Sequence, residues 1–469
     1  MGLQDFTTWI KGVIYKMLHF DETKRVLSTD IAVSESMKGA IELWVQMLQG
    51  RAPWINDNTQ SLGLSAAVAG ELARLVTVEM DSSVTGSARA DYLNGEFELV
   101  HNSLRVQMEF ALASGGMAFK PYFDGDGIAV DCVPAWRFFP TEFNSRGEVT
   151  GAIFVEPLQR GKVFYTRLEQ HILAGNNYTI RNYAFRSTNQ AKLGDPIPLT
   201  AVDEWAELRP EQSIDNVNRV LFAYFRVPFA NTVDTASPLG VSVYSRATGL
   251  ILEADKQYSR ILWEYEGSEL AIDTSQGALI TERKEGRVET YMPERRKRLF
   301  RETGLDQGTS GDLYKVFSPE IRDGALYNGL DKLLKRIEFA CCLSYGTLSD
   351  PQSVEKTAEE IRTSKQRSFT AVADIQEALQ KALEHLIWCM DVYATLYNLA
   401  PAGAYETGFT WGDGVLEDID KEYARRKELV DSGYLKPEKF LAWYLNIPED
   451  EILRDYMPQR DPPMFLPEE

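Results

Sequence analysis

A run of 49 residues, from Gln352 to Ala400, contains neither glycine nor proline, and a proline stands directly on each side of it. Thr357 followed by Glu360 fits the capping box that opens many helices, so we expect a helix over 358–400. At ~1.5 Å per residue this helix is about 60 Å long, close to the ~60 Å diameter of a compact globule of this chain length. A lone compact enzyme rarely contains such a rod, whereas a subunit packed against neighbours in an assembly does. The apolar positions recur mostly at three- and four-residue steps: Ile361, Val372, Ile375, Leu379, Ala382, Leu386, Met390 and Tyr393.

The composition is that of an ordinary globular protein with an acidic excess. The chain has 469 residues, enough for two to four domains, with 44% apolar and 25% charged residues. Its 69 acidic and 50 basic residues give a formal net charge of −19. A general nucleic-acid-binding protein needs a basic face to neutralise phosphates, so this balance argues against that class. One interpretation of the charge is solubility alone, and the other is a surface that stays near DNA without adhering to it.

The cysteines and the N-terminus indicate an intracellular protein. Cys132, Cys341, Cys342 and Cys389 form no CxxC pair, so we expect buried reduced thiols. The first 20 residues lack the apolar core and cleavage site of a signal peptide and suit a short amphipathic helix. No apolar run approaches ~18 residues, so no segment is expected to span a membrane.

The pattern along the chain predicts an α+β protein. Residues 30–115 have helical spacing and end at a Gly-Gly stop, while short runs rich in Val, Ile, Phe and Tyr between Met117 and Val227 predict an antiparallel sheet. The later segments are a helix from Ser237 to Gly267, short strands and loops over 267–323, a helix over Leu326–Cys341, a loop over Ser344–Lys356, the long helix, and a strand at Phe409–Trp411 with two further helices.

Motifs that carry chemistry are missing from the sequence. There is no G-x-x-x-x-G-K-[ST] phosphate loop and no H-E-x-x-H zinc motif. The segment Asp124–Gly127 lacks the remaining ligands of a calcium loop, so a hairpin turn is the better interpretation. We therefore expect no metal, no cofactor and no enzyme activity. The four histidines have no metal-ligand spacing and are expected at the surface or satisfied in the core: His19, His101, His171 and His385.

Several segments, taken in order, are similar to those of one protein family. The chain resembles the portal proteins of tailed bacteriophages, especially the head–tail connector portals of long-tailed phages of Gram-positive hosts. The resemblance covers nearly the whole chain, and the 267–323 region aligns least. The similar segments are Ile41–Trp44, Gly50–Trp54, Glu71–Val76, Ala113–Gly116, Phe119–Tyr122, Ala135–Pro140, Tyr165–His171, Pro238–Val241, Lys356–Ile361, Phe409–Asp413 and Asp418.

The resemblance implies a portal-protein fold with named parts. These parts are a wing of helical body and antiparallel sheet (1–240), a first stem helix (241–266), a small β clip (267–323), a second stem helix (324–343), a tunnel loop (344–357), a long wing helix (358–400), and a C-terminal wing strand with crown helices (401–469).

The same resemblance implies a non-enzymatic function in the virion. Portal subunits form a ring, usually of twelve, at one capsid vertex, and double-stranded DNA is packaged and ejected through it. The implied partners are other copies of the chain, the terminase packaging motor, the head–tail adaptor, and the major capsid and scaffolding proteins, with assembly in the host cytoplasm and no membrane. Two alternatives stay open: another phage structural, adaptor or minor capsid protein, and an intracellular hydrolase or nuclease with an unrecognised site.

Three groups of site residues follow from the resemblance, each with a plainer alternative. The basic residues of the clip would contact the motor, the adaptor or DNA, or form an ordinary solvated face. Basic residues on the second stem helix would line the channel, or be ordinary surface charges. The tunnel loop would touch DNA sterically, or be a plain surface loop. The residues are, respectively, Arg295, Arg296, Lys297, Arg298 and Arg301; Lys332, Lys335 and Arg336; and Tyr345, Gly346, Thr347, Leu348, Ser349, Asp350, Pro351 and Gln352.

Overall fold

The structure is a computed structural model with mixed α and β content, which confirms the expected class. It forms two compact units, the first ending at Trp411 and the second beginning at Gly412. The residues that it describes are 19–269, 271–274, 280–284, 287–291, 300–302, 314–350, 358–411 and 419–445, together with Ile452 and Arg454.

The N-terminal part of the first unit is a helical body with one short strand inside it. Its elements are α2 (Phe20–Leu27), α3 (Glu35–Leu48), α4 (Leu64–Thr77), β1 (Met80–Thr85) and α5 (Ala88–Ser114). The hydroxyls of Ser34 and Ser87 cap α3 and α5, because each accepts a hydrogen bond from the amide three residues later. Sequence reasoning places residues 30–115 in helices only, so β1 is an addition.

The helix α5 ends where two backbone segments almost touch. Gly115 terminates it in the left-handed conformation, with φ 95°, as the Gly-Gly stop predicts. A Cβ atom on Gly115 would lie 2.6 Å from the carbonyl oxygen of Gly240. Val227 and Val243 donate backbone hydrogen bonds to the carbonyls of Gly115 and Leu112, at 3.1 and 3.0 Å. The segment that contains Val227, Gly240 and Val243 is therefore fixed to the end of α5.

The sheet region predicted between residues 117 and 227 is present as two sheets. One has the order β10-β2-β3, and the other β4-β5-β6-β7-β8 with β9 also pairing with β7, and all pairs are antiparallel. The bounds are β2 (Gly116–Phe123), β3 (Ile128–Pro134), β4 (Phe138–Phe143), β5 (Val149–Arg160), β6 (Val163–Ala174), β7 (Asn177–Ser187), β8 (Asp195–Ile197), β9 (Glu211–Asp215) and β10 (Ala223–Arg226). The turn at Asp124–Gly127 joins β2 to β3, as expected for a hairpin.

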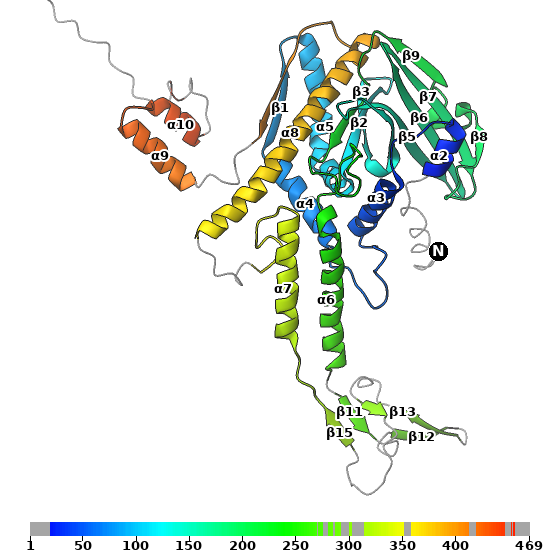
Figure 1. Ribbon diagram of the computed structural model, residues 1–469, viewed down its shortest axis with the longest axis vertical. Helices are drawn as coiled ribbons and strands as arrows, with labels where there is room; N and C mark the ends of the chain where they lie inside the picture. The colour runs from blue at the N-terminus through cyan, green and yellow to red at the C-terminus, as the bar shows by residue number, and fades with distance from the viewer. Residues whose placement is uncertain are drawn as a thin grey trace, which may run out of the picture. The chain divides into compact units, whose positions relative to one another are not determined.

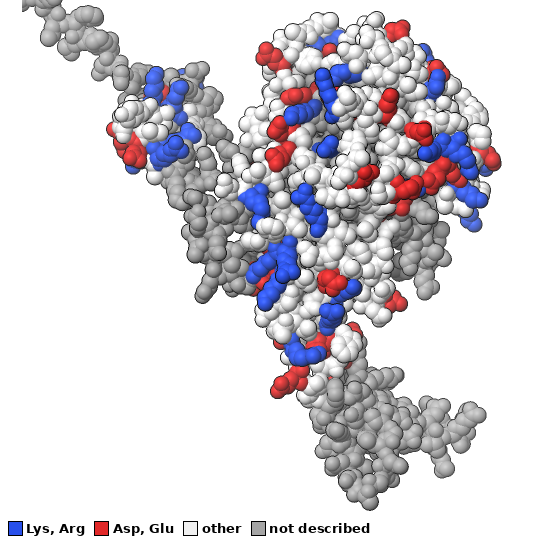
Figure 2. Space-filling model, in the orientation of Figure 1, with Lys and Arg blue, Asp and Glu red and all other residues white. Residues whose placement is uncertain are grey.

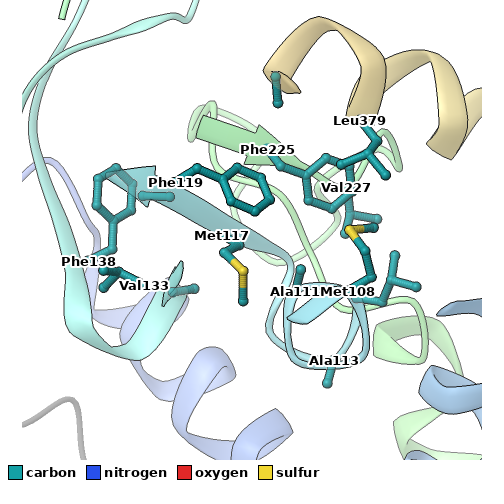
Figure 3. Close-up of a cluster of buried hydrophobic side chains, with 14 of the residues drawn as sticks. Met108, Ala111, Ala113, Met117, Phe119, Val133, Phe138, Phe225, Val227 and Leu379 are labelled. Carbon is teal, nitrogen blue, oxygen red and sulfur yellow. The ribbon is translucent and has the colours of Figure 1, made fainter. Parts of the chain in front are cut away.

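The long helix α8 covers Ala358–Leu396 and packs on the three-stranded sheet and the helical body. It begins where the capping box predicts, although Thr357 lies outside the described residues. It ends at Leu396 rather than at residue 400, because Asn398 adopts a left-handed φ of 54°. Figure 3 shows the shared core, where Leu379 of α8 meets Phe225 and Val227.

The last strand of the first unit pairs with the short strand of the helical body. β16 (Glu406–Trp411) pairs antiparallel with β1, with Ser82 opposite Phe409. Nearby, the buried guanidinium of Arg89 donates to the carbonyls of Ala400 and Pro401, at 2.7 and 3.1 Å. These contacts satisfy backbone acceptors just after α8 and join the chain that follows α8 to the start of α5.

In the sequence, two helices stand between the sheet region and α8: α6 (Thr248–Gly267) and α7 (Asp323–Ala340). They run side by side and are drawn in green and yellow in Figure 1. Residues 237–247, expected inside the first of these helices, instead form an irregular segment, buried over 241–244, that ends in the 3₁₀ turn Ser245–Ala247. The chain between α6 and α7 contains five described strands: β11 (Ala271–Thr274), β12 (Ile280–Lys284), β13 (Arg287–Tyr291), β14 (Phe300–Glu302) and β15 (Tyr314–Phe317). They form a β14-β11-β15 sheet and a β12-β13 hairpin.

The second unit contains the two helices expected near the C-terminus, α9 (Ile419–Asp431) and α10 (Pro437–Leu445). Tyr423 of α9 packs on Phe440 of α10 with 5.4 Å between ring centroids. Arg426 lies over the Trp443 ring at 4.4 Å, so an aromatic cluster joins the pair.

Candidate functional site

The hairpin of α6 and α7, with the loop that follows it, contains most of the described residues singled out from the sequence. The helices pack through buried apolar residues, including Ile261 of α6 and Ile337 of α7. At the start of α7, the Arg322 side chain donates two hydrogen bonds to Glu264 of α6, at 3.0 and 2.7 Å. These hydrogen bonds with Arg322 lower the pKa of the Glu264 carboxyl, so the pair is ionised at neutral pH.

The first half of α6 and the segment before it are fixed to the helical body. Tyr244 donates its hydroxyl proton to the Trp44 carbonyl at 2.7 Å, and both side chains are buried. The carboxylate of Asp255 accepts hydrogen bonds from the Trp54 indole and the Leu62 amide, at 2.9 and 2.8 Å. Burial raises the pKa of Asp255, and these two hydrogen bonds only partly oppose it. A buried carboxylate therefore joins α6 to the loop between α3 and α4.

The hairpin also exposes large aromatic side chains. Trp263 is 66% exposed and Tyr265 39% exposed on α6, while Tyr327 is 48% and Phe339 59% exposed on α7. Tyr265 and Tyr327 hydrogen-bond to each other across the hairpin, and the Phe339 ring meets Arg367 of α8 on one face. Trp263 and the exposed part of Phe339 are available for contact with another surface.

The three predicted channel cations differ in their surroundings. Lys335 is half-buried and forms an ion pair with Asp331 at 2.7 Å. Lys332 and Arg336 are exposed one turn apart, and within the described part of the chain neither forms an ion pair. Figure 2 shows basic side chains over the upper part of α7 on the visible face. Whether any of them faces a channel stays a prediction.

The first part of the predicted tunnel loop is held against α7 by a buried carboxylate. Glu338 has no exposed surface, and its Oε1 accepts hydrogen bonds from the amides of Gly346, Leu348 and Ser349, at 3.0, 2.6 and 2.9 Å. Its Oε2 accepts a fourth hydrogen bond from the Ser349 hydroxyl at 2.9 Å. Asp331, two helical turns earlier, accepts a hydrogen bond from the Asp350 amide at 3.1 Å. Residues 346–350 are therefore a folded extension of α7.

The helix α8 contacts the start of the same loop through Arg367. The guanidinium of Arg367 lies 4.5 Å from the Phe339 ring centre and 5.2 Å from that of Tyr345. It also donates to the Leu343 carbonyl at 3.2 Å. Arg367 thus joins α7, the loop and α8.

Sequence reasoning missed Glu338 and Arg367, although Glu338 left a signal. The negative end of the helix dipole disfavours an acid in the last turn, and Glu338 stands there. An acid in that position implies hydrogen-bond donors beyond the helix.

Other predicted residues fall outside the description. Pro351, Gln352 and 295–298 lie in undescribed segments, and Arg301 is described only as the β14 residue opposite Asp273. Within the described ranges, no group of His, Cys, Asp and Glu could hold a metal, and no helix is long and apolar enough to cross a membrane.

A separate cluster of buried charges lies between the two sheets. Glu169 accepts hydrogen bonds from Lys120 at 2.6 Å and from the His171 imidazole at 2.8 Å, and it forms an ion pair with Arg167 at 3.0 Å. Burial opposes ionisation of Glu169, but the charges of Lys120 and Arg167 outweigh it and hold its pKa well below the usual value. His171 is thus the satisfied core histidine that the sequence suggests. A pocket of about 410 Å³ adjoins this cluster, whose cations are already paired.

Comparisons with known proteins add a distant likeness to a solved structure. No protein-family model matches the chain, and no curated protein matches it. A chain in a solved structure described as the neck of a native GTA particle, computed with C12 symmetry, is similar over 91% of this chain and 99% of that chain. The identity is 11% and the TM-score 0.40, so the likeness carries no argument about function.

Proposed function

We propose that this chain is the portal protein of a tailed bacteriophage, one subunit of a ring, usually of twelve copies, at a capsid vertex. Double-stranded DNA would be packaged and ejected through the ring without a chemical step catalysed by the chain itself. In this proposal α6 and α7 are the stem, residues 267–323 the clip and residues 344–357 the tunnel loop. Residues 1–240, the long helix α8 and the strand β16 are the wing. The helices α9 and α10 are the crown.

The exposed aromatic residues of the α6–α7 hairpin carry this proposal. Burying a large apolar side chain contributes roughly 1.5–3 kcal/mol, and Trp263 and Phe339 leave most of that contribution unused in a single copy. A ring supplies the missing surface, because each copy meets two neighbours through two different patches. In such a ring, the α6 face with Trp263 on one copy would pack against the α7 face with Phe339 on the next.

The loop after α7 fits a fixed part of such a ring. Because Glu338 and Asp331 hold residues 346–350, this segment keeps one position relative to the stem. Lys332 and Arg336 would repeat around the ring as bands of positive charge able to slow the sliding of DNA. The clip would be the docking surface for the terminase motor and later for the head–tail adaptor. The wing and crown would meet the capsid and scaffolding proteins.

Electron microscopy and native mass spectrometry of the purified full-length chain test this proposal. We expect closed rings of about twelve copies with a central hole wide enough for a DNA duplex. Solitary particles at micromolar concentration, without rings, would contradict it. Open arcs or rings that form only with a second phage protein would favour an adaptor or minor capsid protein. Metal-dependent hydrolysis by the purified chain would instead favour an enzyme.

A further inference from the structure

A second pocket, of about 320 Å³, lies where α8 faces the β4–β5 turn and the chain entering β10. Arg219, Arg226, Lys381 and His385 line it, and Glu148 is its single carboxylate. We infer that this pocket binds a phosphate-type oxyanion, held mainly by the guanidinium groups of Arg219 and Arg226.

The two arginines are positioned without carboxylate partners. The Arg219 guanidinium lies 5.2 Å from the ring centre of Trp388, and no ion pair engages it within the described residues. Arg226 uses Nη1 to donate to the Pro238 carbonyl at 2.9 Å. Neither contact neutralises charge, and both leave further N–H donors available. The arginines therefore present oriented positive charge in a chain whose net charge is −19.

The other charged groups of the pocket are already engaged. The Glu148 carboxylate accepts a hydrogen bond from the Asn144 side-chain amide at 2.6 Å, and Lys381 forms an ion pair with Glu377 at 2.6 Å. Each contact joins residues four positions apart in the sequence. They leave two guanidinium groups against one carboxylate, so the pocket has a positive excess.

His385 adds a neutral polar wall. Its Nε2 lies 3.0 Å from the Val220 carbonyl, so this nitrogen carries a proton and donates it. Burial, with a smaller effect of Arg219, lowers the pKa of His385 to about 4. The imidazole is therefore uncharged at neutral pH, and the pocket's positive excess comes from its two arginines.

The larger pocket beside Glu169 shows why this one is preferred. There, Lys120 and Arg167 each contact a carboxylate directly. An incoming anion would compete with those carboxylates for the same donors. Within the described residues, no carboxylate forms an ion pair with Arg219 or Arg226, so an anion would not have to displace one there.

The chemistry of the two guanidinium groups suits phosphate as the ligand class. A guanidinium presents parallel N–H donors that match two oxygens of a phosphate, and such hydrogen bonds are roughly twice as strong as neutral ones. The phosphate could belong to the free ion or to a nucleic-acid backbone. Both present the same oxygens, so the experiment has to separate the two sources.

Titration calorimetry with inorganic phosphate tests the site on the full-length chain, with sodium chloride at equal ionic strength as reference. We expect saturable binding that weakens at least tenfold in Arg219→Gln and in Arg226→Gln. Arg219→Lys should lie between, because it keeps the charge but loses the paired donors. The matched control is Arg181→Gln, an exposed arginine paired with Glu211 outside the pocket, which should bind like the unaltered chain.

The outcomes are separable. Phosphate binding no stronger than the chloride reference, or equal binding by Arg219→Gln and the unaltered chain, would overturn the inference. Circular dichroism of each variant shows whether a loss of binding is a loss of folding, and Arg219→Lys remains informative if Arg219→Gln does not fold. Displacement of bound phosphate by a short DNA duplex would identify the backbone as the source. Phosphate binding without displacement would identify the free ion.

Discussion

At the scale of single residues, the contact between Gly115 and Gly240 decides how the segment before α6 meets the helical body. A Cβ atom on either residue would collide with the carbonyl oxygen of the other, so neither position has room for a side chain. The sequence marks Gly115 as a helix stop, but not as a close contact, because its partner lies more than a hundred residues later.

Replacing Gly115 by alanine should destabilise the protein by about 3 kcal/mol, because the new Cβ combines a left-handed φ with a clash at 2.6 Å. The measurement is the free energy of unfolding in guanidinium chloride. Gly125→Ala is the matched control, since Gly125 has a φ of 109° with nothing within 4 Å of the added Cβ. A loss in Gly115→Ala no larger than in the control would show that the close contact is unimportant.

His385 should make stability fall on mild acidification. Its pKa is about 4 in the folded protein against 6.5 ordinarily, so unfolding takes up a proton between these pH values. Stability contributed by neutral His385 is therefore complete above pH ~6.5 and lost as the pH falls toward 4, by up to about 3 kcal/mol. Thermal unfolding of His385→Asn between pH 7 and pH 4 should show a shallower decline. His101→Asn, a half-exposed histidine on α5, should keep the original slope, and equal slopes in all three proteins would contradict the assignment.

At the scale of elements, the end of α7 and the loop after it form one unit through Glu338. A carboxylate that is fully buried needs hydrogen-bond donors, and here the loop backbone supplies them. The loop's conformation is thus set by a helix residue, with Gly346 and Ser349 as its receiving positions.

Glu338→Gln should loosen this loop while keeping the size of the side chain. An amide replaces a charged acceptor of four hydrogen bonds, each worth about 1.5–3 kcal/mol when charged, so the loop should open more often. Hydrogen exchange at Gly346, Leu348 and Ser349 should accelerate at least tenfold. Glu253→Gln, an exposed α6 residue paired with Lys256, is the control and should leave these amides unchanged. Equal protection in both variants would refute the role of Glu338.

The elements differ in how far the sequence predicts them. The helix α8 is predictable because a long run without glycine or proline, with one apolar stripe, has few alternatives. The strand β1 is not, because Met80–Thr85 is short and its stabilising partner β16 is distant in the chain. Lys332, Lys335 and Arg336 look equivalent in sequence, yet Asp331 pairs with Lys335 alone among the three in the described structure. Such differences depend on contacts that a helical pattern does not contain.

At the scale of the whole molecule, the exposed aromatic residues of the hairpin predict how copies associate. The double variant Trp263→Ala, Phe339→Ala should dissociate the proposed rings at concentrations where the unaltered chain is assembled. Removing two large apolar contacts per interface weakens every interface of a closed ring at once. Analytical ultracentrifugation measures the shift. Val26→Ala on α2, 47% exposed, is the control and should assemble normally. Intact rings of the double variant would exclude these residues from the interface.

The pairing of β1 with β16 also has a consequence during synthesis on the ribosome. The two strands lie roughly 320 residues apart. At ~5–20 residues per second, β1 waits roughly 15–60 s for its partner to be translated. For that time a newly made strand edge is open to pairing with other nascent chains, so association between chains competes with correct folding at this stage of synthesis.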